Sequence, residues 1–371
     1  MSWMRLVAMA RKEWLQLRRD PRSMTLAFVL PVLMLLFFGY AITWDVKDLD
    51  LVVLDQDRTA RSRTLIEAFG ASGYFTVVDR LDSYGQVADA VGRGNAGSVL
   101  VIPPGFARDL AAGREAPVQL LLDGADANSA TIAFNYADAI VDRWSRDAVL
   151  QGRDLRLPLT AEVRTWYNPT LSSRNMIVPG LISVIMMTIA AMLTALTIAR
   201  EWERGTMEQL VSTPATKLEI LIGKLVPYVV IGLLDVGLIV LAGLFIFGVP
   251  FRGPVVVFFA QTFLFLVGAL GLGMLISAAA KTQFLATQVA LIATLLPAML
   301  LSGFLFEIEA MPEVLQAITY LVPARYHVVV ARGIMLKGVG PGVLWIQSVF
   351  MIVFAVVGIG LAARVFKKEV A

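Results

Sequence analysis

The sequence predicts an α-helical polytopic membrane protein with six transmembrane helices and an α/β domain inserted between the first and second spans. Its 371 residues are 57% hydrophobic and only 16% charged, whereas soluble domains average about 25% charged residues. The apolar residues gather in runs long enough to cross a bilayer, which takes about 20 residues. A polar stretch, 45–174, separates the first run from the other five.

Each long apolar run gives one expected span. Residues 24–44 form the first span, and the region 175–371 holds the rest. These five are expected at about 176–199, 225–248, 255–279, 285–306 and 343–364. The segment 307–338, between the last two runs, is partly apolar but interrupted, so we do not count it as a span.

Residues 1–23 predict a cytoplasmic amphipathic helix at the membrane interface. Tryptophan and aliphatic residues recur there at helical spacing, and six Lys or Arg residues outnumber the two acids. Such a helix lies in the interfacial plane with its apolar face in the headgroup region. A signal-peptide n-region is the alternative interpretation, although this segment and the apolar run after it are both long for one.

The positions of the basic residues set the expected orientation. Both the N-terminal flank and the C-terminal tail are basic, which places both termini in the cytoplasm, and an even number of spans agrees with this. The loop 200–224 then also faces the cytoplasm. The stretch 45–174 and the segment 307–342 face outward.

The outward-facing stretch predicts a layered α/β module, because short strand patterns alternate in it with helical ones. Strands are expected at 49–55, 74–81, 97–103, 117–123 and 161–167. The longest helical pattern covers 129–152. An Asp-rich run at 123–128 is compatible with a cation site or with a turn. Calcium-loop spacing is absent, which favours the turn.

The chain lacks the residues and motifs of many enzyme classes. It has no Cys and one His, which excludes disulfides, thiol catalysis and zinc sites built from these residues. Gly223-Lys224 has neither the preceding loop nor the following Ser/Thr of a phosphate loop. His327 has no nucleophile motif to pair with, so we expect it at the outer membrane interface. The small net charge of +3 gives no indication of a nucleic-acid partner.

Asp235 lies in the middle of an expected span. Ionisable side chains at that depth are costly, and they usually face a cavity or a partner. Two interpretations stay open for this residue. It is either a polar point on a translocation path or the donor or acceptor of a structural hydrogen bond to a neighbouring span.

A charged stretch, 199–214, lies between the second and third expected spans. Met207 and Leu210 belong to an apolar stripe at helical spacing, and Pro214 interrupts that helix. A Thr-x-x-Glu capping box at 216–219 starts the next one. A loop that only connected two spans would not need this alternation of Glu and Arg. The stretch therefore favours a contact with another protein over a solvated loop.

Three segments carry a family resemblance. They are YNPTLSSRNMIVPG (167–180), AREWERGTMEQLVSTPATKLEILIGKLVPY (199–228) and LSGFLFEIEAMPEVLQAITYLVPARYHVVVARGIMLKG (301–338). Together they resemble the membrane permease subunits of bacterial ABC-type exporters, the ABC type-2 permease family, over nearly the whole chain. The large domain after the first span is similar to that of the longer, multidrug-exporter-like subgroup.

The resemblance implies that residues 200–214 form a coupling helix that contacts a separate ATPase subunit. The expected contact residues are Arg200, Glu201, Trp202, Glu203, Arg204, Gly205, Met207, Glu208 and Leu210. Among them, Met207 and Leu210 would sit in a groove of the ATPase, and the Glu and Arg side chains would supply charged contacts. The resemblance also implies an outer re-entrant segment at 307–338.

The resemblance further implies the partners and the compartment. Two ATPase subunits would carry ATP and Mg, and this chain would bind no cofactor. The chain would pair with a second copy or with a sister permease in the bacterial inner membrane. A periplasmic adaptor protein would dock on the domain 45–174.

These expectations combine into a permease subunit of an ATP-driven exporter. Its substrate would be hydrophobic or amphipathic, drug-like or lipid-like, because few charges line the spans. One alternative is a mechanotransmitting ABC membrane subunit, which drives periplasmic partners without passing substrate through its spans. The other is a membrane-anchored enzyme with a catalytic domain at 45–174, which the missing motifs disfavour.

Overall fold

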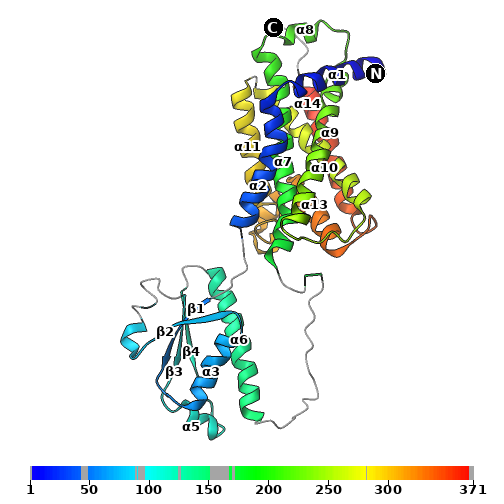
Figure 1. Ribbon diagram of the computed structural model, residues 1–371. Helices are drawn as coiled ribbons and strands as arrows, with labels where there is room; N and C mark the ends of the chain where they lie inside the picture. The colour runs from blue at the N-terminus through cyan, green and yellow to red at the C-terminus, as the bar shows by residue number, and fades with distance from the viewer. Residues whose placement is uncertain are drawn as a thin grey trace. The chain divides into compact units, whose positions relative to one another are not determined.

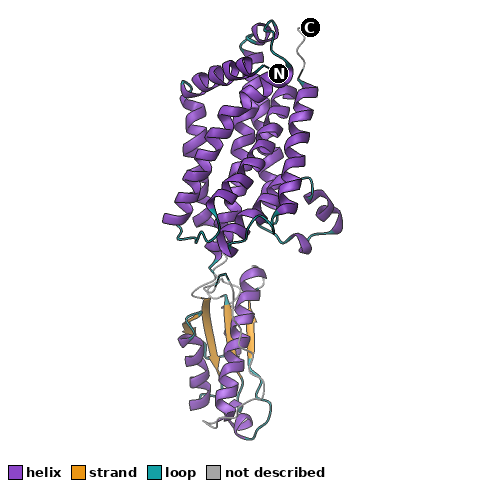
Figure 2. Ribbon diagram, turned by 90° about the vertical axis from the view of Figure 1, so that its right-hand side faces the viewer, coloured by secondary structure: helices purple, strands orange, loops and turns teal. Residues whose placement is uncertain are grey.

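The chain forms two compact units in the computed structural model. The first unit comprises Met1–Thr43 and Arg164–Ala371, and the second comprises Trp44–Val163. The structure describes residues 2–42, 49–87, 90, 97–123, 127–150, 167–168, 172–280 and 282–366. The first unit is built of helices, and the second contains a sheet with helices beside it (Figure 1; Figure 2).

Within the described residues, six helices of the first unit are long and apolar enough to cross a membrane, which confirms the number expected from the sequence. They are α2 (Pro21–Ala41), α7 (Ser173–Glu203), α9 (Lys217–Phe245), α10 (Val255–Ala280), α11 (Gln283–Leu300) and α14 (Trp345–Val365). Helix α7 is the central one, because it packs against α2, α9, α10, α11 and α13 (Pro323–Arg332).

Helices α7 and α10 are in unusually close contact. A Cβ atom added at Gly273 would lie 2.2 Å from the backbone oxygen of Ala191, so only glycine fits there. Thr194 Oγ1 donates a hydrogen bond to the Leu270 carbonyl oxygen at 2.9 Å. Ser277 Oγ accepts hydrogen bonds from two backbone amides of α7 at 2.9 Å each. Polar bonds therefore join the two helices at several levels.

The interrupted segment before the last span is bent. Helix α12 (Glu313–Thr319) and the helical stretch Pro323–Lys337, which comprises α13 and the π-helical turn η3 (Gly333–Lys337), meet at 81°. This geometry is that of a broken span or a re-entrant loop. The guanidinium of Arg332 donates to three backbone carbonyls, those of Met176, Gly303 and Phe304. The bent segment is therefore tied to the start of α7.

Helix α1 (Trp3–Arg18) precedes the first span and packs on α9. Its side toward the bundle buries Leu6, Glu13 and Leu17. The tryptophans that contribute to the sequence periodicity, Trp3 and Trp14, lie on an exposed side instead. The helix therefore turns one side toward the protein and leaves its tryptophans on another.

The second unit is a four-stranded sheet with the strand order β2-β1-β3-β4. The strands are β1 (Leu49–Asp55), β2 (Phe75–Arg80), β3 (Ser98–Ile102) and β4 (Gln119–Leu122). Strand β1 pairs in parallel with β2 and β3, and β4 pairs antiparallel with β3. The helical elements are α3 (Ala60–Ala71), η1 (Tyr84–Gln86), α5 (Phe106–Ala111) and α6 (Ala127–Leu150). Four of the five predicted strands are thus present; residues 161–166 of the fifth lie outside the described residues.

Apolar side chains are buried on both faces of the sheet, because successive residues of a strand point to opposite faces and both sets pack in clusters. On one face, Leu51 and Val53 pack in a cluster that includes Phe69 of α3. On the other face, Val52 and Leu54 pack in a separate cluster. The unit therefore has hydrophobic cores of its own. Most of the Asp-rich run 123–128 lies outside the described residues.

Phe69→Ala is expected to destabilise this unit by about 3–5 kcal/mol, because the fully buried ring leaves a cavity beside Phe75. The test is urea unfolding of residues 44–163 produced alone. The exposed Tyr84→Ala is the control and should change the unfolding free energy by less than about 0.5 kcal/mol. Equal effects of the two changes would contradict an independent core.

Candidate functional site

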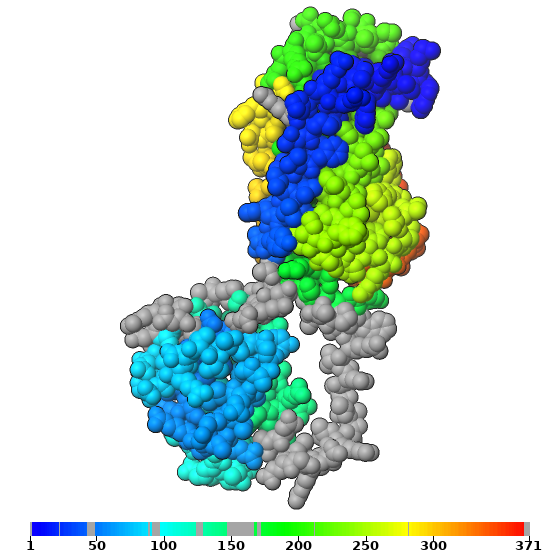
Figure 3. Space-filling view, viewed as in Figure 1, coloured from blue at the N-terminus to red at the C-terminus, as the bar shows by residue number. Residues whose placement is uncertain are grey.

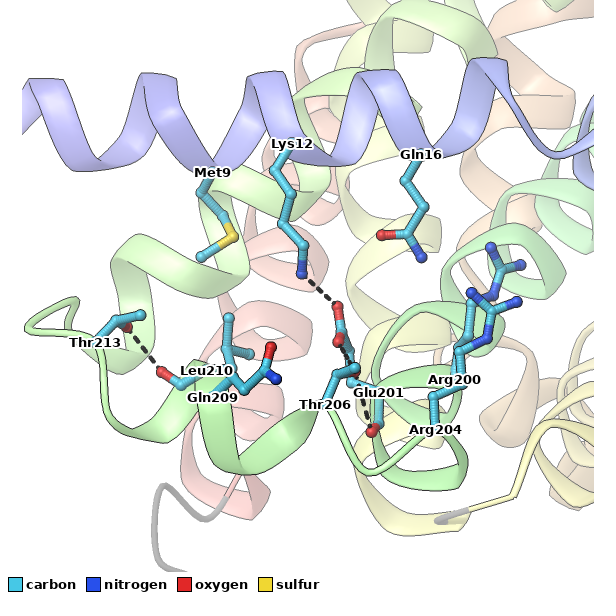
Figure 4. Close-up of a pocket in the computed structure, with 10 residues that line it drawn as sticks. All are labelled: Met9, Lys12, Gln16, Arg200, Glu201, Arg204, Thr206, Gln209, Leu210 and Thr213. Carbon is cyan, nitrogen blue, oxygen red and sulfur yellow. Dashed lines mark hydrogen bonds and ion pairs between the residues drawn. The ribbon is translucent and has the colours of Figure 1, made fainter.

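A cavity of about 360 Å³ lies between α1 and the segment that follows α7 (Figure 4). Helix α1 contributes Met9, Lys12 and Gln16. The other side of the cavity is formed by Arg200, Glu201, Arg204, Thr206, Gln209, Leu210 and Thr213. Figure 3 shows the same neighbourhood on the surface, where the blue N-terminal helix lies against the green segment around α8 (Met207–Val211). The site is therefore assembled from two parts of the chain that are far apart in sequence.

Local sequence explains how the chain turns between α7 and α9. Helix α7 ends at Glu203, and Gly205 follows in the left-handed region with φ of 67°, a conformation that glycine adopts without strain. The short α8 comes next. Thr216 then caps α9. Its hydroxyl accepts a hydrogen bond from the backbone amide of Glu219, and the Glu219 carboxylate accepts one from the backbone amide of Thr216. The predicted capping box is thus confirmed.

A buried ion network joins three helices beside the cavity. Lys224 of α9 is 0% exposed, and its Nζ lies 2.9 Å from Glu13 Oε2 of α1 and 3.2 Å from Glu201 Oε1 of α7. Lys12 Nζ lies 2.8 Å from Glu201 Oε1. Tyr228 donates a hydrogen bond to Glu13 Oε1 at 3.2 Å. The two lysines balance the two glutamates, so the desolvated charges are paired.

Further polar contacts hold both ends of α1. At its C-terminal end, Arg200 Nη1 lies 3.0 Å from Asp20 Oδ2, and Arg200 Nη2 donates to Ser23 Oγ at 3.1 Å. At its N-terminal end, the Ser2 amide donates to the Glu219 carboxylate. Helix α1 is therefore fixed to α7 and α9 at its two ends and in the middle.

The structure divides the expected coupling residues into buried and exposed groups. Arg200 and Glu201 are buried in ionic contacts within this chain, and Trp202 is half-buried. Met207 and Leu210 are only 2% and 6% exposed and belong to the main hydrophobic core. The expectation that these two side chains sit in a partner's groove is revised, because they pack inside this chain.

The exposed group consists of Glu203, Arg204, Gly205 and Glu208. Glu203 accepts hydrogen bonds from the backbone amide and the side chain of Gln283, at the start of α11. Arg204 lines the cavity. The segment thus presents charges of both signs outward while its apolar side chains face inward.

Lys12, Glu13 and Lys224 also belong to the site, although the sequence did not predict them as members. Glu13 follows Leu6 at a spacing of seven residues and precedes Leu17 by four, so it lies on the buried side of α1. A Cβ atom added at Gly223 would lie 2.7 Å from Met9 Cβ, which shows how closely α1 approaches α9. An acid on a buried helical side and a lysine inside an apolar run were the available signals.

Asp235 lies away from the cavity, on the buried side of α9. It is 1% exposed, and neither carboxylate oxygen has a hydrogen-bond partner among the described residues. The hydrogen bond to a neighbouring span, which was one of the two interpretations, is therefore not formed within the described part of this chain.

His327 lies in the core, and its expected position at the membrane interface is corrected. It is fully buried, and its ring nitrogens are hydrogen-bonded with Ser183 Oγ at 2.8 Å and Thr262 Oγ1 at 3.0 Å. The ring stacks on Phe265 with 4.3 Å between centroids. With both nitrogens occupied, His327 links α13 to α7 and α10.

Comparison with known proteins identifies the family. The sequence profile described as "ABC-2 family transporter protein" matches residues 22–364. The chain belongs to this family. Among the relatives, the probable multidrug ABC transporter permease YbhS of Escherichia coli is 39% identical over 363 residues, covering 97% of this chain and 96% of the relative. YbhR of Escherichia coli, with the same description, is 32% identical over 368 residues, covering 99% of each chain.

A more distant relative matches a smaller share of the chain. The linearmycin resistance permease protein LnrN of Bacillus subtilis is 21% identical over 338 residues, covering 83% of this chain and 85% of the relative. The match of the family profile begins at residue 22, so it covers all six candidate spans apart from the last residue of α14 and leaves out α1. This ABC-2 chain is accordingly a multi-pass membrane protein of the ABC permease type.

Lys224→Ala is expected to destabilise this ABC-2 chain by about 3–5 kcal/mol, because Glu13 would stay buried without a cationic partner and Glu201 would keep only Lys12. The measurement is thermal unfolding of the purified full-length protein in detergent. Lys217→Ala, an exposed lysine at the start of the same helix, is the control. The double change Lys224→Met with Glu13→Gln should recover part of the loss. A melting temperature for Lys224→Ala equal to that of the control would refute the role of the network.

Proposed function

We propose that this chain is the transmembrane permease subunit of an ATP-driven ABC exporter in the bacterial inner membrane. It moves a hydrophobic or amphipathic substrate, drug-like or lipid-like, out of the cytoplasm or the inner leaflet. The family membership and the names of the relatives, probable multidrug ABC transporter permeases, support this proposal. ATP and Mg are bound by two separate ATPase subunits, and a second copy or a sister permease completes the transporter.

The proposal rests mainly on the way buried ion pairs attach the 200–214 segment to the spans. Its exposed residues Arg204 and Glu208 are available to a partner on the surface. Glu201, directly before them in α7, is joined to Lys12 and Lys224. A displacement of this segment by an ATPase is therefore passed to α1, α7 and α9 together, because the buried ion pairs hold the three helices at one point.

Transmission continues through α7 into the bundle. This helix is buried on all sides and packs against five other helices. In this scheme Arg204 and Glu208 are the main contacts with the ATPase, and Glu203 and Gly205 complete the exposed surface. Arg200, Glu201, Trp202, Met207 and Leu210 instead hold the segment in place. Residues 1–23 lie on the cytoplasmic face, with both termini cytoplasmic.

The α/β unit faces the periplasm in this proposal and offers a docking surface to an adaptor protein. Its two hydrophobic cores let it fold separately from the spans. The same observation favours a second candidate function, a mechanotransmitting subunit that moves this unit and passes no substrate through its spans. An exporter needs a path for substrate among the spans, whereas a mechanotransmitting subunit needs none.

The double change Arg204→Ala with Glu208→Ala is expected to weaken binding of the cognate ATPase subunit about tenfold or more, since charged contacts at the centre of an interface contribute over 1 kcal/mol each. The measurement is co-purification and stimulated ATP hydrolysis. The matched control is Arg63→Ala with Glu67→Ala, an exposed pair at the same spacing on α3. Wild-type ATPase binding by the first variant would rule out this contact surface.

Asp235→Asn is expected to alter efflux while leaving ATPase docking intact, because we place this side chain on the substrate path. Its melting temperature should equal or exceed that of the wild type, since the unpartnered buried carboxyl is replaced by a neutral amide. Efflux of several substrates and thermal unfolding are measured on the same variant. Unchanged efflux of all substrates would assign Asp235 to packing and favour the mechanotransmitting function.

A further inference from the structure

A second cavity, of about 210 Å³, lies where α1 turns into α2. It is lined by Trp14, Leu17, Arg18, Met24, Phe28 and Ile231. None of these residues lines the cavity beside the coupling segment. Five of the six side chains are apolar or aromatic, and Arg18 alone brings a charge. The cavity is therefore suited to a hydrocarbon group with an anionic group beside it.

The basic residues on the two sides of α1 differ in whether they pair with an acid of this chain. Arg11, Trp14 and Arg18 share one side, because they follow one another at spacings of three and four residues. Neither arginine forms an ion pair within the described part of the chain. On another side, Arg5 contacts Glu219 and Lys12 contacts Glu201. The arginines near the second cavity thus lack the internal acid that the other basic residues have.

The position of the cavity along the spans matches the headgroup region of a bilayer. Met24 and Phe28 lie in the first two turns of the candidate span Ser23–Ala41. Trp3 and Trp14 are exposed on α1, and tryptophan is enriched where headgroups meet acyl chains. An acyl chain entering the cavity from this level would place its phosphate near the arginines of α1.

We infer that this cavity is a binding site for an anionic phospholipid from the leaflet against which α1 lies. The acyl chain fills the space between Trp14, Met24 and Phe28, and Arg18 with Arg11 pairs with the phosphate and the anionic headgroup. Charge complementarity selects this occupant, because a lipid anion supplies the negative charge that the chain does not place there. The inference is independent of what the protein transports.

The occupied site would also support the ion network. Leu17 lines the lipid cavity, and Glu13, one turn earlier on the same side of α1, binds Lys224. A lipid that fixes this end of α1 therefore helps to hold Glu13 in place. Lipid composition then influences the same junction to which the coupling segment is attached.

The test uses Trp14 as the reporter in full-length protein reconstituted in phosphatidylcholine nanodiscs. Brominated phosphatidylglycerol or brominated phosphatidylcholine is added at equal mole fractions, and the Trp14 signal is the difference between the wild type and Trp14→Phe. We expect the anionic lipid to quench this signal at about tenfold lower mole fraction. Arg18→Gln and the cavity-filling Met24→Phe should each abolish the preference.

Two control variants separate a site from general attraction to the surface. Arg364→Gln removes an exposed arginine at the end of the last span, and Leu33→Phe enlarges an exposed side chain on α2. Both should keep the preference for the anionic lipid. Equal quenching by the two lipids, or a preference that survives Arg18→Gln and Met24→Phe, would overturn the inference. Absence of quenching by either lipid would also overturn it, and would indicate that a second copy covers the cavity.

Discussion

The burial of Lys224 between Glu13 and Glu201 is the constraint on which the rest of the junction depends. A fully desolvated ammonium is tolerated only with close anionic partners, and these come from two other helices. Helix α1 is therefore an integral part of the bundle. Glu201, in the last turn of α7, in turn positions the segment that follows this helix. Removing Lys224 leaves Glu13 buried without a cationic partner.

Charged side chains hold both ends of α7, through ion pairs at one end and through hydrogen bonds to backbone carbonyls at the other. At one end Glu201 is held by lysines, and at the other the Arg332 guanidinium binds the Met176 carbonyl and two carbonyls of the turn before α12. The middle is fixed by packing and by the hydrogen bond between Ser183 and His327. Contacts at both ends and in the middle make α7 suited to move as one unit, as the proposed function requires.

Sequence alone predicted the elements well and the contacts poorly, for physical reasons. Spans and strands follow from local hydropathy and alternation, so the six helices and β1 fell where expected. The pairing of Glu13 with Lys224 joins residues 211 positions apart, and no local pattern encodes it. The apolar stripe with Met207 and Leu210 was recognised, but periodicity does not tell whether such a stripe meets its own chain or another. His327 was misplaced because its partners come from two distant helices.

The close contact of α7 with α10 restricts how the bundle can change shape. Because Gly273 leaves no space for even a methyl group, and Thr194 and Ser277 bond across the contact, separating these helices would break several buried hydrogen bonds at once. In the proposed function we therefore expect the pair to move as one unit. A change of access to a substrate path would then take place at the other surfaces of these two helices, and not between them.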